Sequence, residues 1–300
     1  MNGIDTRGFM EANTERAVVE ILRRIEPLLP KREEDIDWSA PAFRWRKKRY
    51  LGIEVGELEP IGQVAYVEAE NLLNIDEQKK RLFANTEQFV RGLPANNILL
   101  TGARGTGKSS LIRAALTAFY KDGLRLIEVD KHDLGDLGDI TSLVGKRPEK
   151  FLIFCDDLSF EVGESGYKAL KAALDGSAAA SGDNMLIYAT SNRRHLLPER
   201  MEDNVSSHLD EKGDLHPAET IEEQLSLSER FGIWLSFYPY TQDEYLRIAE
   251  GWTIALGGKT DENWRGEALR FALHRGSRSG RIAHQFARDW VGRCALKETK

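Results

Sequence analysis

Short apolar runs alternate with helical patterns along the middle of the chain. The apolar runs predict strands over residues 97–101, 124–129, 151–155 and 185–190, with a fifth candidate over 233–237. Helical spacing of apolar positions predicts helices over residues 75–91, 108–120 and 167–174. Strands that alternate with helices are typical of βαβ units. The pattern therefore predicts an α/β fold built on a parallel sheet.

The pattern changes at both ends of this region. After Pro239, three helical patterns follow one another without a strand, over residues 242–256, 262–274 and 280–296. Near the start, residues 15–29 have helical spacing, whereas residues 31–60 contain scattered Pro and Gly and are expected to be irregular. We therefore expect an N-terminal extension over residues 1–60, an α/β core over 61–240, and a helical domain over 241–300.

Composition excludes several classes of protein. The chain has 300 residues, 41% of them hydrophobic, which is enough for a core and excludes whole-chain disorder. The longest stretches without a charge span 12 residues, too few for a membrane helix, and the first residues lack the apolar run of a secretory signal. Two cysteines exclude a disulfide framework and favour a reducing cytoplasm.

Charge is unevenly distributed within a net charge of −6, which itself argues against a general nucleic-acid coat protein. The run Arg44–Tyr50 carries five cationic and two aromatic side chains in seven residues, whereas residues 51–78 and 201–229 are acidic. The run would bind nucleic acid, with Trp45 and Tyr50 stacked on bases. Alternatively, its aromatics pack on the core while the cations stay in water. A third interpretation is docking onto an acidic face of a neighbouring subunit.

The clearest chemical motif lies between the first core strand and its helix. It matches the pattern G-x-x-x-x-G-K-[ST], in which backbone N–H groups and the helix N-terminus surround phosphate oxygens. Lys108 would contact the β- and γ-phosphates, and Ser109 would ligate Mg²⁺. A glycine-rich turn that binds nothing would explain neither the Lys-Ser pair nor the flanking strand and helix. The predicted nucleotide-binding residues are Gly102, Ala103, Arg104, Gly105, Thr106, Gly107, Lys108, Ser109 and Ser110.

Polar side chains also follow two later apolar strands. Asp156 and Asp157 end the run FLIFCDD, where an open α/β sheet binds its ligands. Asp156 would hold Mg²⁺, and Asp157 would orient the attacking water. Asn192 ends the run LIYATSN, which should lie beside the acidic strand, and would bind the γ-phosphate or the water. The alternatives are an exposed acidic turn and an ordinary turn asparagine.

Two arginines are candidates to complete the site. Arg230, in the run SERFG, would neutralise transition-state charge on a neighbouring subunit's nucleotide. A surface arginine paired with nearby acids is the alternative. Arg281, at the start of the last predicted helix, would point back at the phosphates, and Arg278 is a weaker candidate one turn earlier. Solvated arginines in a helix-capping region are the alternative.

The order of these motifs resembles that of the AAA+ ATPases over residues 72–296. The resemblance implies a P-loop NTPase with a Rossmann-like core, a small all-helical lid, and a homo-oligomer in the form of a ring or helix. It also implies ATP and Mg²⁺ as ligands. In the terms of that family, Gly102–Ser109 would be Walker A, Asp156 and Asp157 Walker B, Asn192 sensor 1, Arg230 the arginine finger and Arg281 sensor 2.

The chain resembles more closely an uncharacterised bacterial family of compact AAA+ proteins of unknown function. The runs that carry this resemblance are AFRWR, ANNILLTGARGTGKSSL, FCDDLSFE and ATSNRRHLLPE. The core also resembles helicase loaders and initiators. One departure is Asp157, where AAA+ proteins usually have Glu; the side chain is one methylene shorter, so turnover would be slow unless Glu161 assists.

Three functions follow as expectations. The first is an enzyme that hydrolyses ATP to ADP and phosphate in order to remodel or load a macromolecular partner. The second is a helicase-loader-like ATPase that contacts nucleic acid through Arg44–Tyr50. The third is a switch that binds ATP and hydrolyses it slowly or not at all, because of Asp157.

Overall fold

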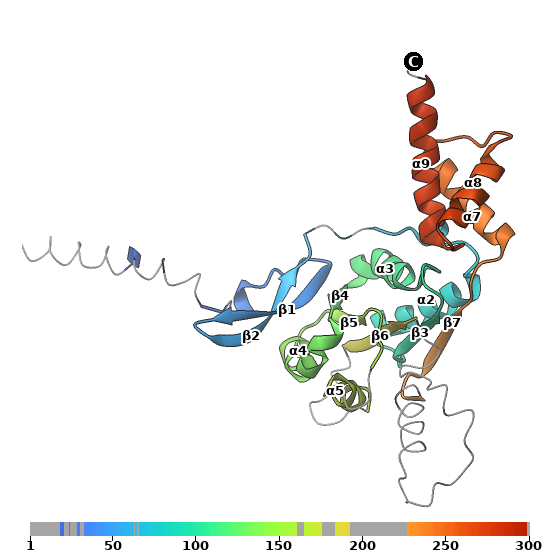
Figure 1. The fold of residues 1–300 in the computed structure, drawn as a ribbon. Helices are drawn as coiled ribbons and strands as arrows, with labels where there is room; N and C mark the ends of the chain where they lie inside the picture. The colour runs from blue at the N-terminus through green and yellow to red at the C-terminus, as the bar shows by residue number, and fades with distance from the viewer. Residues whose placement is uncertain are drawn as a thin grey trace, which may run out of the picture.

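A seven-stranded sheet forms the centre of the molecule, with helices on both of its faces and a bundle of three helices beside one end (Figure 1). The computed structural model describes residues 19–20, 24, 29–30, 33–62, 64, 66–160, 165–175, 184–192, 227 and 229–298. Most of the predicted helix over 15–29, Glu161 and most of the acidic stretch 201–229 lie outside the described residues.

The sheet has the strand order β2-β1-β4-β5-β6-β3-β7. All neighbouring strands are parallel except β1 and β2, which form an antiparallel hairpin. The central strands of the sheet are apolar because helices cover both faces of the sheet. The strands are β1 (Ala42–Tyr50), β2 (Ile53–Pro60), β3 (Ile98–Gly102), β4 (Leu124–Glu128), β5 (Lys150–Cys155), β6 (Met185–Ser191) and β7 (Ile233–Phe237).

Helices cover the sheet on both sides (Figure 1). One face packs against α2 (Asp76–Val90) and α3 (Lys108–Phe119). The other packs against the 3₁₀ helix η5 (Lys131–Asp136), α4 (Leu137–Val144) and α5 (Ser165–Leu174). Three further 3₁₀ turns are η2 (Glu33–Asp35), η3 (Ala69–Asn71) and η4 (Tyr120–Asp122).

The C-terminal helices form a small unit with its own core, which we call the lid. It consists of α7 (Gln242–Ala255), α8 (Trp264–His274) and α9 (Gly280–Glu298). Phe286 lies at its centre and contacts Trp264, Phe271 and Trp290. The first lid helix begins with a capping box, in which Thr241 and Glu244 each bond the other's backbone. The predicted fold class, α/β with a parallel sheet followed by a small all-helical domain, is confirmed.

The prediction of irregular chain over residues 31–60 is wrong for residues 42–60, which form β1 and β2. Pairing with the rest of the sheet decides this region, because β1 joins β4 in parallel with Ala42 opposite Leu126. Gly56, read as a sign of irregular chain, lies in β2 under the Trp45 ring, where a Cβ would come 2.0 Å from Trp45 Cζ2. The hairpin therefore belongs to the sheet.

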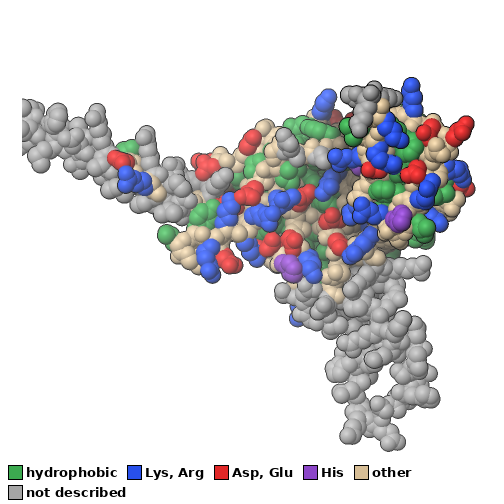
Figure 2. Space-filling model, turned by 45° about the horizontal axis from the view of Figure 1, so that its top comes forward, with side chains coloured by type: hydrophobic (Ala, Val, Ile, Leu, Met, Phe, Trp, Pro, Cys, Tyr) green, Lys and Arg blue, Asp and Glu red, His purple; other side chains and the backbone are tan. Residues whose placement is uncertain are grey.

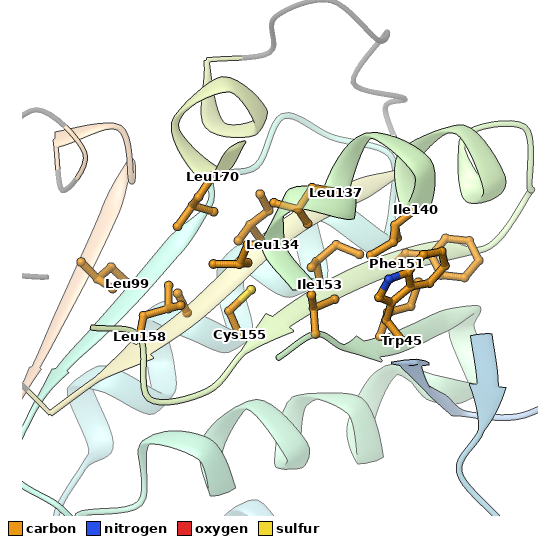
Figure 3. Close-up of a cluster of buried hydrophobic side chains, with 14 of the residues drawn as sticks. Trp45, Leu99, Leu134, Leu137, Ile140, Phe151, Ile153, Cys155, Leu158 and Leu170 are labelled. Atoms are coloured by element: carbon orange, nitrogen blue, oxygen red, sulfur yellow. The ribbon is translucent and has the colours of Figure 1, made fainter. Parts of the chain in front are cut away.

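Trp45 is a core residue. Its side chain is 4% exposed and packs beside Phe151 and Ile140 (Figure 3). Its indole Nε1 donates a hydrogen bond to Asp136 Oδ2 at 2.9 Å. The idea that Trp45 stacks on bases is therefore wrong, and the alternative that it packs on the core is confirmed.

Acids of neighbouring segments pair with three cations of the Arg44–Tyr50 run. Arg44 contacts Glu128, Lys47 contacts Asp136, and Lys48 contacts Glu59. Arg46 and Arg49 are exposed, and neither has an ion pair within the described part of the chain. In that same part, no helix combines the length and the apolar character needed to cross a bilayer.

Replacing Trp45 by Ala should lower the free energy of unfolding by about 3–5 kcal/mol, because the change leaves a large cavity and removes one of the two donors to Asp136, the other being Lys47. The neighbouring Arg46→Ala should change it by less than about 0.5 kcal/mol, because Arg46 lies on the solvated side of the same strand. Urea denaturation of both variants measures the difference. Equal, small effects would show that the hairpin is not part of the cooperative core.

Candidate functional site

A tight loop joins the end of β3 to the start of α3. Gly102, Gly105 and Gly107 all have positive φ values, of 126°, 73° and 98°. A Cβ at Gly102 would lie 1.9 Å from the carbonyl oxygen of Phe237 in the adjacent strand, so only glycine fits there. This backbone shape turns the chain directly into α3, whose N-terminus favours an anion.

Lys108 begins α3 and is buried over the loop. Its Nζ donates hydrogen bonds to Gly102 O at 2.7 Å, Ala103 O at 2.8 Å and Asn192 Oδ1 at 3.1 Å. Burial lowers the pKa of Lys108 to about 8, although the nearby Asp156 and Asp157 charges act in the opposite direction. A phosphate at this position would stabilise the charged amine further.

Asp156 and its partners form a compact group of oxygens at the end of β5. Its Oδ1 accepts hydrogen bonds from Ser109 Oγ at 2.7 Å and from Thr190 Oγ1 at 2.6 Å. The Thr190 hydroxyl also accepts the backbone N–H of Asp157 at 2.9 Å. A hydroxyl and a carboxylate in contact are the hard oxygen ligands that suit Mg²⁺ alongside phosphate oxygens and water.

Asp157 has the left-handed backbone conformation, with φ 54°, which Asp tolerates better than most residues. Its carboxylate accepts a hydrogen bond from Asn192 Nδ2 and lies 3.7 Å from an Arg104 guanidinium nitrogen. Because Asn192 also bonds Lys108, one network connects the loop lysine, the strand-tip amide and the second carboxylate.

The loop and the two strand tips line a cleft of about 670 Å³ whose other wall is the lid. Tyr240 and the lid residues Ile248, Trp252 and Arg281 lie on that wall. Residues 71–73 and Ile75, which precede α2, also line the cleft. Figure 2 shows the lid side of the molecule, where Lys and Arg side chains are spread widely with acids between them.

The structure brings most of the predicted residues into this one cleft. They are Arg104, Gly105, Thr106, Gly107, Lys108, Ser109, Ser110, Asp156, Asp157, Asn192 and Arg281. Gly102 and Ala103 lie behind the loop, and their carbonyls face Lys108.

Arg230 lies away from the cleft of its own chain. Its guanidinium pairs with Asp175, which follows α5. Arg278 lines a second pocket of about 620 Å³, behind the loop. The prediction that Arg230 acts on another subunit's nucleotide is untested.

Comparison with known protein families gives a match to a family of unknown function, as the motifs predicted. The family described as "Protein of unknown function (DUF815)" matches residues 39–294. The chain belongs to this family. The resemblance to a family of unknown function, inferred from the motifs, is thereby confirmed. No curated protein matches the chain.

Solved structures resemble this DUF815 member only distantly. The Thermotoga maritima RuvB Holliday junction branch migration motor is 16% identical over 74% of this chain and 63% of that chain, with a TM-score of 0.48. The Aeropyrum pernix ORC1 protein, solved in complex with DNA, is 17% identical over 72% of this chain and 61% of that chain, with a TM-score of 0.49. This DUF815 chain thus spans less than two thirds of the length of either structure.

Sequence reasoning missed several residues of the cleft in this DUF815 protein. Thr190 carries no motif signal of its own. It stands two residues before Asn192, however, and the alternation of side chains along a strand places residues two apart on the same face of the sheet. Ile248 and Trp252 come from the lid, and Tyr240 comes from the segment that leads into it. Only the packing of the lid against the core brings them to the loop.

Thr190→Val should weaken Mg²⁺-dependent ATP binding at least about fivefold, because Asp156 and the Asp157 N–H each lose a hydrogen-bond partner. Titration calorimetry with and without Mg²⁺ measures this. Thr86→Val is the matched control, since Thr86 is also buried and bonded twice but lies outside the cleft. Both variants should lose about 1–3 kcal/mol of stability. Equal ATP affinity in the two variants would contradict the role of Thr190.

Proposed function

We propose that this protein is an ATPase of the AAA+ type that binds ATP with Mg²⁺ in the cleft and hydrolyses it to ADP and phosphate. The observation that carries the proposal is the convergence of Lys108, Ser109, Asp156, Asp157 and Asn192 at one sheet edge. A glycine-rich turn of purely structural role would not require a lysine, a hydroxyl and two carboxylates around one space.

The loop and α3 would hold the phosphates. Residues 105–110 line the cleft, and their backbone N–H groups would bind the phosphates together with the positive end of α3. Lys108 would exchange its contacts with Gly102 O and Ala103 O for phosphate oxygens. Ser109 and Asp156 would hold Mg²⁺, which when bound neutralises phosphate charge.

Asp157 would orient the attacking water. Its carboxylate is half-exposed to the cleft and is held by Asn192, so its direction is set before a ligand arrives. Asn192 bonds both Lys108 and Asp157, so a γ-phosphate that moved either side chain would also shift the hydrogen bonds of Asn192. Arg281 would approach the phosphates from the lid.

The apolar part of the cleft lining would suit the adenine base. Leu72, Leu73, Ile248 and Trp252 all line the cleft, and their side chains would give apolar walls of the kind that cover a flat ring. His284 packs edge-on against Trp252, with the ring centroids 4.5 Å apart. Burial and the nearby Arg288 charge lower the pKa of His284, so a neutral imidazole borders the base.

The protein would act as a homo-oligomer on a macromolecular partner. Arg230 lies outside its own cleft, which is what a residue acting on a neighbour's nucleotide requires. A nucleic-acid partner is a narrower alternative, supported by the exposed Arg46 and Arg49 rather than by Trp45.

A slow ATP-binding switch is the second candidate function. Asp157 has a short side chain, and Asn192 and Arg104 already engage both of its carboxylate oxygens. A carboxylate engaged in this way is a weaker acceptor for a water proton. Tight ATP binding with negligible turnover would identify this function.

Lys108→Ala should reduce ATP turnover at least about 100-fold, because the variant loses the cation that would stabilise the negative charge of the transferred phosphate. Lys121→Ala, an exposed lysine of η4, is the control and should keep the wild-type rate. Phosphate release is measured with and without single-stranded DNA. Wild-type protein that binds no ATP would overturn the proposal, and stimulation by DNA that disappears in Arg46→Ala/Arg49→Ala would favour the nucleic-acid alternative.

Arg230→Ala and Lys108→Ala chains should each be inactive alone and should partly recover activity when mixed. Mixed oligomers contain interfaces at which an intact Lys108 of one chain meets an intact Arg230 of the next. Turnover is measured over a range of mixing ratios. Recovery at no ratio would contradict action of Arg230 between subunits.

A further inference from the structure

The first residue of the last lid helix and a tyrosine that leads into the lid both bond directly to the backbone of the phosphate loop. The Tyr240 hydroxyl donates to the carbonyl oxygen of Thr106 at 2.7 Å. The backbone N–H of Gly280, at the start of α9, donates to the carbonyl oxygen of Gly105 at 2.8 Å. Loop and lid are therefore joined at two successive peptide groups.

These bonds matter because of how a phosphate loop works. Its N–H groups must point inward at the anion, so its carbonyls point outward and need donors elsewhere. Within the core, Lys108 supplies donors for Gly102 and Ala103. Gly280 of the lid supplies the donor for Gly105, and Tyr240, which leads into the lid, supplies the donor for Thr106. Because Thr106 is only 2% exposed, water is a poor substitute beside it.

Close packing strengthens the same contact. A Cβ at Gly105 would lie 2.8 Å from Ser279 Cβ, so the missing side chain lets the first turn of α9 press against the loop. Ser279 is buried, and its Oγ accepts the N–H of Ile282 at the helix start. The lid thus meets the loop through a capped helix end, which is a rigid element.

Tyr240 is placed to join the two parts. It stands between the last sheet strand, β7, and the capping box that begins α7. Burial raises the pKa of its phenol to about 12, so the hydroxyl remains a donor over the whole physiological range.

We propose that Tyr240 is a positioning residue that couples the lid to the loop: the peptide groups of Gly105 and Thr106 keep their phosphate-binding orientation only while the lid is seated on them. The inference rests on the proposed function, because it assigns a role at the same phosphate site. It adds that lid movement changes nucleotide affinity through the loop backbone, in addition to contacts of the lid with the nucleotide itself.

Tyr240→Phe tests the coupling, with Tyr245→Phe as the matched control. Both tyrosines are substantially buried, and each hydroxyl donates to a backbone carbonyl, but Tyr245 bonds Ala268 inside the lid at 3.1 Å. Two measurements are made on each variant: amide hydrogen exchange of the nucleotide-free protein, and calorimetric titration with ADP and Mg²⁺.

Tyr240→Phe should speed exchange of the amides of residues 103–110 about fivefold and weaken ADP binding about fivefold, which corresponds to one net hydrogen bond. Lid amides should keep their wild-type exchange. Tyr245→Phe should do the reverse: it should speed exchange within α7 and α8, lower thermal stability, and leave loop exchange and ADP affinity within twofold of wild type.

Equal loop exchange and equal ADP affinity in wild type and Tyr240→Phe would overturn the coupling. So would an effect of the same size from Tyr245→Phe, since the change would then reflect general loosening of the lid. A wild-type protein that binds no ADP or ATP would instead defeat the proposed function, and the exchange data of the nucleotide-free protein would still report whether Tyr240 holds the loop.

Discussion

The candidate site depends on the parallel pairing of three buried strands. β6 lies between β3 and β5, with Thr101 opposite Ser191 on one side and Cys155 opposite Ala189 on the other. All three strands therefore end at the same edge of the sheet. The loop lysine, the strand-tip amide and the two carboxylates meet there although they are distant in sequence, because parallel strands bring their carboxyl ends together.

This arrangement has a cost that the surrounding contacts offset. A buried lysine and a left-handed aspartate are each unfavourable in isolation. Thr190 satisfies Asp156 and the backbone of Asp157, and Asn192 joins Lys108 to Asp157. On the outer side of the loop, Gly280 of the lid and the adjoining Tyr240 satisfy the carbonyls of Gly105 and Thr106. Hydrogen bonds thus run from the carboxylates at the sheet edge, through the phosphate loop, to the lid.

The hairpin of β1 and β2 shows how tertiary pairing overrides local signals. Its sequence is rich in charge and contains Gly56, which favoured an irregular or ligand-binding segment. In the fold, alternation sends Phe43 and Trp45 into the core, while Arg44 and Lys48 pair with acids of β4 and β2. The charge of this run is therefore largely neutralised within the sheet, and Arg46 and Arg49 are the part of it that faces outward without an ion pair among the described residues.

The sequence by itself determined the α/β core, the three lid helices and the phosphate loop, because periodicity and glycine spacing are local properties of the chain. It also predicted Asp156, Asp157 and Asn192, since polar residues that end apolar strands must reach one sheet edge. Only the tertiary structure decided the strand order, the hairpin, and the cleft residues Thr190, Tyr240 and Trp252. These depend on contacts between segments that are separate in sequence, from Thr190 with Asp156, 34 residues apart, to Tyr240 with Thr106, 134 residues apart, and no local pattern encodes that choice.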